Sequence, residues 1–376
     1  MMPCACSRGR DVSTIALLVF PVVVATGTDS ALEATARITQ CKDCTITATS
    51  VVSLGPADGP GAFASRPYSA ALDARGRYYV VTPETVNETP LVFNSNGTFL
   101  RRLGRAGEGP GEYRAPSVIL ATRDDSIVIV DDRLARITVL SPDYSLVRTI
   151  PVPPNITSAA YLQDGSFIVN APIRTSASIG LPLHRLSPDG RLINSFGAHT
   201  AVALPREVAR IVRWFFVTDE EKVWVVPYAH EYAVELWETG GTRLKRFLRT
   251  PDWYRPYARY GTPTPERAPA PRLLGIWQDS LGYVWVIGHL PDPRWREALG
   301  SPITAEGQRY FPIRDQQLAY DGFVEVMDPD RGIPFAYRRL PQTLDLVVRP
   351  GIVGGVRERA DGSLYLEIIR LGLANP

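Results

Sequence analysis

One pattern recurs six times along the chain, and this repetition constrains the fold more than any other feature. Each copy begins with a short apolar stretch, passes through an Asp or Gly turn into a strongly apolar strand, and continues with further strands joined by a second turn. The first copy spans residues 70–104. Repeats of this length are typical of propellers and solenoids, and a chain with 33 Pro and 30 Gly favours many short strands joined by turns.

Each copy supplies about four strands, which predicts an all-β fold, a six-bladed β-propeller, because sheets arranged radially leave only short protected edges. The sixth copy, at residues 361–369, ends before an outer strand. Residues 45–55 match the outer-strand position that residues 99–104 hold in the next copy. We therefore expect the N-terminal strand to complete the last blade and close the ring.

An aspartate marks the first turn of each copy, and the period places each one in a different blade at the same rim. We interpret these residues as turn formers rather than as a carboxylate cluster, since Asp in a tight turn bonds its own backbone. The six residues are Asp73, Asp124, Asp164, Asp219, Asp279 and Asp361.

The stretch at residues 104–111 is rich in glycine but has no Lys-Ser/Thr ending, and Pro110 removes an N–H donor. It predicts a crossover between blades rather than a phosphate-binding loop. The cassette with its G-E-G-P-G-E-Y crossover at residues 107–113 resembles the NHL-like and TolB-like six-bladed β-propeller proteins that bacteria export. The resemblance covers essentially the whole mature chain and implies the fold. It does not imply an activity, because propellers of this shape host binders, lyases, lactonases and quinone-dependent dehydrogenases.

The N-terminus predicts export. Arg8 and Arg10 precede an apolar run at residues 15–25, which is too short to span a bilayer and has the length of a signal-peptide core. An A-x-A site ends at Ala36. We predict a signal peptide at residues 1–36 and a single propeller domain at 37–376, located in the periplasm, at the outer membrane or outside the cell. Retention of the apolar run as an anchor is the alternative, and no transmembrane segment is expected in the mature chain.

Cys41 and Cys44 form a lone C-x-x-C at the mature N-terminus. In an exported protein a disulfide is the first interpretation. A redox site and a metal site are the alternatives, although no second pair of metal ligands lies nearby in the sequence.

Polar residues follow the inner strands of four successive copies. These residues are Asp132, Asn170, His230 and His289. Because the loops at the ends of blades converge on a central channel, we expect the four side chains to surround one ligand at the channel mouth.

Two insertions interrupt the repeat, at residues 251–271 and 291–320. They carry Trp253, Tyr257 and Trp295, the kind of aromatic residue that recognition surfaces use. The insertions could contribute to ligand binding, or they could pack over the propeller face.

The formal charge of +2 gives no reason to expect a nucleic-acid partner. The sequence favours a non-catalytic binding or scaffold protein of the cell envelope, with a protein or small-molecule ligand held at one propeller face. The alternative is a metal-dependent hydrolase or lyase, lactonase-like, with its site at the channel mouth. No cofactor is firmly implied, and a Ser-His-Asp hydrolase is unsupported because no G-x-S-x-G follows a strand.

Overall fold

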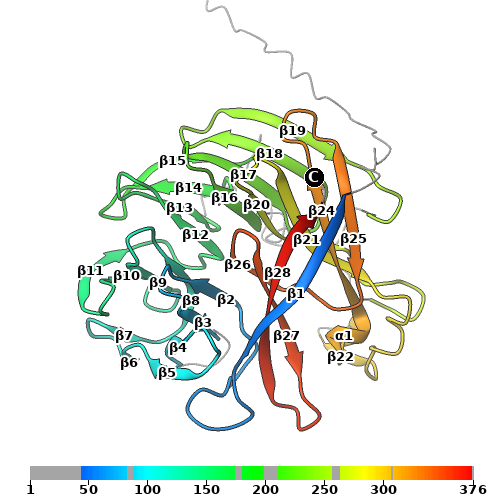
Figure 1. Cartoon of the computed structure of the whole chain (residues 1–376), viewed down its shortest axis with the longest axis horizontal. Helices are drawn as coiled ribbons and strands as arrows, with labels where there is room; N and C mark the ends of the chain where they lie inside the picture. Colours follow the sequence, from blue (N-terminus) through cyan, green and yellow to red (C-terminus); the bar gives the residue numbers. More distant parts are fainter. Residues whose placement is uncertain are drawn as a thin grey trace, which may run out of the picture. The chain divides into compact units, whose positions relative to one another are not determined.

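Six four-stranded antiparallel sheets are arranged around a common axis in the computed structural model (Figure 1). The structure describes residues 44–82, 88–173, 180–198, 211–255, 263–305 and 308–374, which all belong to one unit, Leu32–Pro376. The innermost strand of each sheet contacts the innermost strands of the two neighbouring sheets. The predicted all-β, six-bladed β-propeller is therefore confirmed.

In the first three blades, the strands follow the chain order from the axis outwards. The first contains β2 (Ser69–Leu72), β3 (Tyr78–Val81), β4 (Leu91–Phe93) and β5 (Phe99–Arg102). The second contains β8 (Pro116–Ala121), β9 (Ile127–Asp131), β10 (Arg136–Leu140) and β11 (Leu146–Pro151). The third contains β12 (Ser158–Tyr161), β13 (Phe167–Asn170), β14 (Leu183–Leu186) and β15 (Leu192–Phe196).

The other three blades are built in the same way, except that the outermost strand of the sixth comes from the start of the chain. The fourth contains β16 (Arg213–Val217), β17 (Lys222–Pro227), β18 (Tyr232–Glu238) and β19 (Arg243–Arg249). The fifth contains β20 (Arg272–Gln278), β21 (Val284–Pro291), β24 (Tyr320–Met327) and β25 (Pro334–Leu340). The sixth contains β26 (Leu346–Arg349), β27 (Ile352–Glu358), β28 (Leu364–Ala374) and β1 (Thr45–Leu54). Short elements outside the blades are β6 (Arg105–Ala106), β7 (Glu112–Tyr113), β22 (Ile303–Ala305), β23 (Gln308–Tyr310) and α1 (Gln316–Ala319).

The core lies between adjacent blades, and strand alternation divides it. In β9, Ile127 and Ile129 pack with Tyr79 of the first blade, whereas Val128 and Val130 pack with Phe167 of the third. Successive side chains of a strand point to opposite faces of its sheet. The middle of a second strand is therefore largely apolar, because its blade is covered on both faces.

The sixth blade combines strands from the two ends of the chain. β1 pairs antiparallel with β28 from Thr45↔Ala374 to Leu54↔Leu366, with an irregularity between Ser50 and Val52. Leu54 is completely buried in the core between the sixth and first blades. Figure 1 shows β1 along the outer side of β28.

The connections divide between two ends of the propeller. We call the end where the chain passes from one blade to the next the crossover end, and the opposite end the hairpin end. Every blade repeats the same strand directions. The connections between second and third strands therefore lie at the crossover end. The turns that join the first strand to the second, and the third to the fourth, lie at the hairpin end. The crossover at residues 104–111 is confirmed between β5 and β8. Gly104 has a φ of +65°, which favours glycine, and an added Cβ would lie 2.2 Å from the Gly111 carbonyl.

The prediction that the aspartates form turns is largely confirmed, but the predicted position of one of them needs correction. Asp73 accepts from the Arg77 N–H at 2.8 Å, and Asp279 accepts from the N–H groups of its own turn. Asp361 also accepts from its own turn, at Ser363. It stands between the second and third strands of the sixth blade, however, so it lies at the crossover end and not at the rim of the other five. An Asp-Gly turn suits either connection, so the local pattern could not tell them apart.

Both insertions leave from the crossover end. The first connects β19 to β20, and the second connects β21 to β24, where Pro291 pairs with Tyr320. The second contains β22, β23 and the single helical turn α1, which Asp315 caps by accepting from the N–H groups of Gln317 and Leu318.

Candidate functional site: the axial channel

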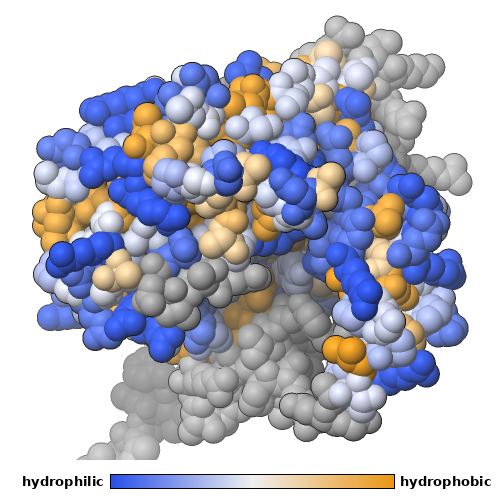
Figure 2. Space-filling model, turned by 90° about the horizontal axis from the view of Figure 1, so that it is seen from below, coloured by the Kyte–Doolittle hydropathy of each residue, from blue (hydrophilic) through white to orange (hydrophobic). Residues whose placement is uncertain are grey.

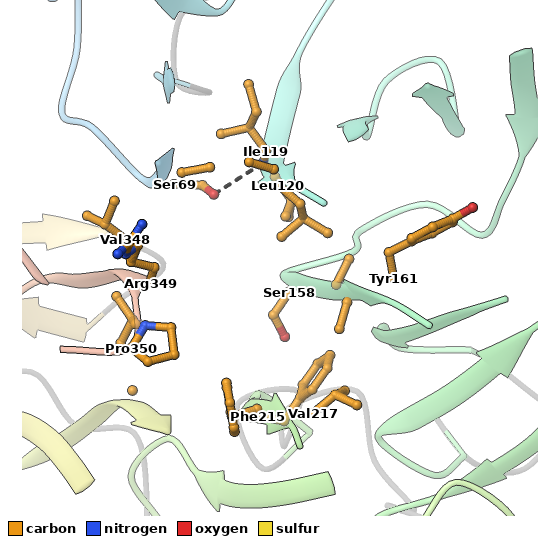
Figure 3. A pocket seen from close by; sticks show the side chains of 18 of the residues that line it. Ser69, Ile119, Leu120, Ser158, Tyr161, Phe215, Val217, Val348, Arg349 and Pro350 are labelled. Atoms are coloured by element: carbon orange, nitrogen blue, oxygen red, sulfur yellow. Dashed lines mark hydrogen bonds between the residues drawn. The ribbon is translucent and has the colours of Figure 1, made fainter. Parts of the chain in front are cut away.

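The six innermost strands wall a cavity of about 620 Å³ along the propeller axis. Every blade contributes to the wall, because β2, β8, β12, β16, β20 and β26 all line it. Figure 3 shows labelled side chains of β2, β8, β12, β16 and β26 around the open space. Residues that are distant in the sequence thus meet around one concave site.

Much of the wall is apolar. Phe215 and Val217 of β16 stand on one side, and Val348 and Pro350 stand on another (Figure 3). Phe215 and Val217 are only partly buried, although they also pack against the core between the third and fourth blades. Apolar area that the fold leaves uncovered inside a concave site is available to a ligand.

Serines on the inner strands join neighbouring blades. The Ile119 N–H donates to Ser69 Oγ at 3.2 Å, the contact drawn in Figure 3. Ser158 Oγ donates to the Arg213 carbonyl at 3.1 Å. Inner strands present unpaired backbone groups to the channel, and these hydroxyls satisfy some of them. The serines therefore fix the wall, and their roles are structural.

A carboxyl group with a raised pKa lies near the crossover end of the channel. Asp132 is partly buried and accepts from the Ile156 N–H at 3.1 Å. Burial raises the pKa of Asp132 to about 6. Tyr68, which lines the channel, has a pKa raised to about 12 by burial and by the neighbouring Asp132 and Tyr228. Asp132 thus lies close to a residue that lines the cavity.

Asn170 is buried and holds neighbouring segments together. Its Oδ1 accepts from Thr157 Oγ1 and from the Arg213 N–H, and its Nδ2 donates to the carbonyls of Pro182 and Ile211 at 2.7 and 2.9 Å. All polar atoms of the amide are engaged. Asn170 therefore connects the third and fourth blades.

His230 is half-buried, and its Nε2 lies 3.5 Å from a carboxylate oxygen of Glu231. The contact with His230, together with the Arg246 guanidinium, lowers the pKa of the Glu231 carboxyl. Arg246 donates to Glu231 at 2.8 Å. His230 thus belongs to a charged cluster within the fourth blade.

His289 is buried at the junction of the fifth and sixth blades. Its Nε2 lies 3.5 Å from Asp345 Oδ1, and its ring centroid lies 5.3 Å from that of Tyr320. Burial lowers the pKa of His289 to about 4, so the ring is neutral at pH 7. Asp345 also pairs with Arg66 at 2.7 Å, which ties the segment before β2 to the sixth blade.

The structure thus places the four predicted residues at the same end of the propeller, each in a separate environment. None of them lines the cavity. Among the described residues, no hydrogen bond or ion pair joins any two of the four. That they meet around one ligand remains a prediction.

Among the described aromatic residues of the insertions, Trp253 and Trp295 do not line the cavity. Trp253 packs against Phe323 and stacks on Tyr337, with ring centroids 4.9 and 5.5 Å apart, so it covers the core of the fourth and fifth blades. Trp295 is 5% exposed. Tyr257 lies outside the described residues, as do Ala36 and Cys41, so the cleavage site and the disulfide with Cys44 stay predictions.

The sequence reasoning missed the residues that do line the channel, such as Phe215, Val217 and Arg349. The sequence did contain a signal for these lining residues, because the first strand of each copy is the strand nearest the axis of a propeller. The fourth copy has three adjacent aromatic residues there, Trp214 to Phe216. In a strand covered on both faces such residues are ordinary core, so their partial exposure could not be read from the sequence.

Metal ligands do not cluster in the described residues. Within the part of the chain that the structure describes, no three His, Cys, Asp or Glu side chains gather closely enough to hold a metal ion.

Along the described residues, no helix combines the length and the apolar character needed to cross a membrane. On the side shown in Figure 2, apolar residues form small groups among hydrophilic ones, which is ordinary for a protein surface.

Comparison with known proteins supports the fold. A family model described as "6-bladed beta-propeller" matches residues 69–178, the first two blades and part of the third. A search of curated proteins found no match to this chain.

Solved structures that align with this chain include one from Staphylococcus aureus and two from Bacteroides. Virginiamycin B lyase from Staphylococcus aureus aligns with a TM-score of 0.46 and 8% identity, covering 88% of this chain and 100% of that one. A protein described as a candidate exported protein from Bacteroides fragilis aligns with a TM-score of 0.52 and 9% identity, covering 88% and 96%. A member of the DUF4221 family from Bacteroides vulgatus aligns with a TM-score of 0.57 and 8% identity, covering 89% and 99%. The chain is a six-bladed β-propeller, similar in fold to the two Bacteroides proteins.

Proposed function

We propose that this protein is an exported, non-catalytic binding protein that holds a small, largely apolar molecule in its axial channel. The observation that carries the proposal is the cavity of about 620 Å³ with partly exposed apolar side chains on its wall. Ligand sites are concave, mostly apolar and roughly 300–1,000 Å³ in volume. The apolar run at residues 15–25 supports export, as does the fold that the chain shares with a candidate exported protein.

A binding role is favoured because the serines and the amide near the channel are used within the protein. Ser69 and Ser158 bond the backbone of neighbouring blades, and Asn170 is fully engaged. A rigid wall of strands preorganises a site, so that a ligand need not order the protein on binding.

The test is binding of N-phenyl-1-naphthylamine, a neutral apolar probe that fluoresces when it leaves water. We expect saturable binding to the full-length mature protein. Ala160 lines the cavity and is partly exposed, so Ala160→Phe should fill the space and weaken binding at least about tenfold. Val217→Trp gives a second obstruction on another strand.

The matched control is Ala360→Phe, which adds the same ring at an exposed position outside the cavity. It should bind the probe like the wild type. Melting temperatures show which variants are folded. Wild-type protein that does not bind the probe, or folded Ala160→Phe and Val217→Trp variants that bind it unchanged, would overturn the proposal.

A further inference from the structure

The charged side chains on the channel wall differ in the partners that the protein gives them. Four charged side chains line the cavity, namely Arg123, Asp124, Glu221 and Arg349. All four stand near the hairpin end, because they follow or end inner strands. Their partners decide which of these side chains is available to a ligand.

Three of the four have partners within the protein, and of these three only Arg123 has a partner of opposite charge among the described residues. Arg123 forms an ion pair with Asp219 across the mouth of the channel. Glu221 accepts from the Gln163 N–H at 2.8 Å. Asp124 accepts from hydroxyl groups of its own turn, first of all from Thr122, and these contacts lower the pKa of its carboxyl.

Arg349 is the exception. It is the last residue of β26, it is exposed, and it forms no ion pair within the described part of the chain. Burial raises the pKa of the Tyr78 phenol while Arg349 and Arg370 both lower it, and a tyrosine is neutral at pH 7 with or without these effects. Figure 3 places Arg349 on the wall beside Val348 and Pro350, with the apolar Phe215 and Val217 on a neighbouring part of the wall.

We propose that the channel ligand carries an anionic group, such as a carboxylate, which Arg349 binds while the apolar part of the molecule contacts Phe215 and Val217. This inference rests on the proposed function, since it names the class of ligand for the same cavity. A guanidinium matches a carboxylate with two parallel hydrogen bonds, and such charge-assisted contacts are stronger than neutral ones. Because Arg349 has no acidic partner among the described residues and stands beside apolar wall, it favours an amphiphilic anion over a neutral molecule with the same framework.

The test compares two probes with almost the same aromatic framework. 1-Anilinonaphthalene-8-sulfonate carries an anionic group, and N-phenyl-1-naphthylamine does not. The wild type should bind the sulfonate more tightly by about tenfold at low salt, and the preference should shrink as salt screens the exposed guanidinium. Arg349→Ala should abolish the preference, with less than about a twofold effect on the neutral probe, and Arg349→Lys should retain part of it.

Arg370→Ala is the matched control. Arg370 is another exposed arginine at the hairpin end, on β28, and it does not line the cavity. Its removal should leave the preference for the sulfonate intact. Failure of the neutral probe to bind the wild type would count against the proposed function itself. If the neutral probe binds but the sulfonate is not preferred, or if Arg349→Ala keeps the preference, the channel is a binding site and the anion assignment is wrong.

Discussion

Truncation of one residue in the N-terminal strand tests whether that strand is part of the sixth blade. Leu54 is the last residue of β1 and is completely buried, although its strand partner Leu366 lies at the other end of the chain. Leu54 packs in the core that the sixth blade shares with the first. Leu54→Ala should therefore destabilise the whole propeller and not only a terminus.

The magnitude follows from the burial. Removing three carbons costs about 2.4 kcal/mol at about 0.8 kcal/mol per buried methylene, and the residual cavity brings the loss to about 3 kcal/mol. For a domain of roughly 330 residues the unfolding entropy is about 0.7 kcal/mol per kelvin, so the melting temperature should fall by about 4 °C.

Differential scanning calorimetry measures this shift, and Val51→Ala provides the control. Val51 lies in the same strand at its irregular position and is 42% exposed, so its truncation should cost less than about 0.5 kcal/mol. If Leu54→Ala melts within a degree of the control, β1 does not support the sixth blade in solution. Deletion of residues 45–54 should expose the edge of β28 and cause aggregation, whereas a monomeric deletion variant with unchanged melting would contradict the blade order.

Three further predictions concern other parts of the chain. Glu325 is fully buried and pairs with a buried arginine at 2.9 Å, so Glu325→Gln should cost about 3–5 kcal/mol in urea denaturation, and a loss below about 1 kcal/mol would argue against the pair. His289 has a folded pKa of about 4 against an ordinary 6.5, so the unfolded chain binds the proton more readily. Its contribution to stability is full above pH 6.5 and is lost as the pH falls towards 4, by about 3 kcal/mol in all. His289→Phe should flatten the unfolding free energy measured across that range, and an unchanged slope would contradict this. The intact mass of the exported protein should correspond to cleavage after Ala36 with a Cys41–Cys44 disulfide, and a retained N-terminus or two free thiols would refute it.

Much of the fold could be predicted because its signals are local. The apolar runs of the second strands, such as residues 127–130, and the aspartate turns repeat along the chain at positions that each blade needs for itself. The turn at Asp361 was misplaced because an Asp-Gly turn fits both hairpin and crossover connections. For Trp253 the sequence left open a ligand site or packing over the propeller face. Its ring packs on Phe323 and Tyr337, which lie far from it in the sequence.

By itself, then, the sequence determined the repeat, the number of blades and the outer-strand character of residues 45–55, since alternation and turn chemistry act over a few residues. Only the tertiary structure decided which side chains face the axis and which charges remain unpaired. Arg123 finds Asp219 two blades away, whereas Arg349 finds no acid within the described residues. Such pairings depend on how blades pack around the ring, and no local pattern encodes a contact between residues nearly a hundred positions apart. The charge that the channel offers a ligand is therefore a property of the assembled propeller.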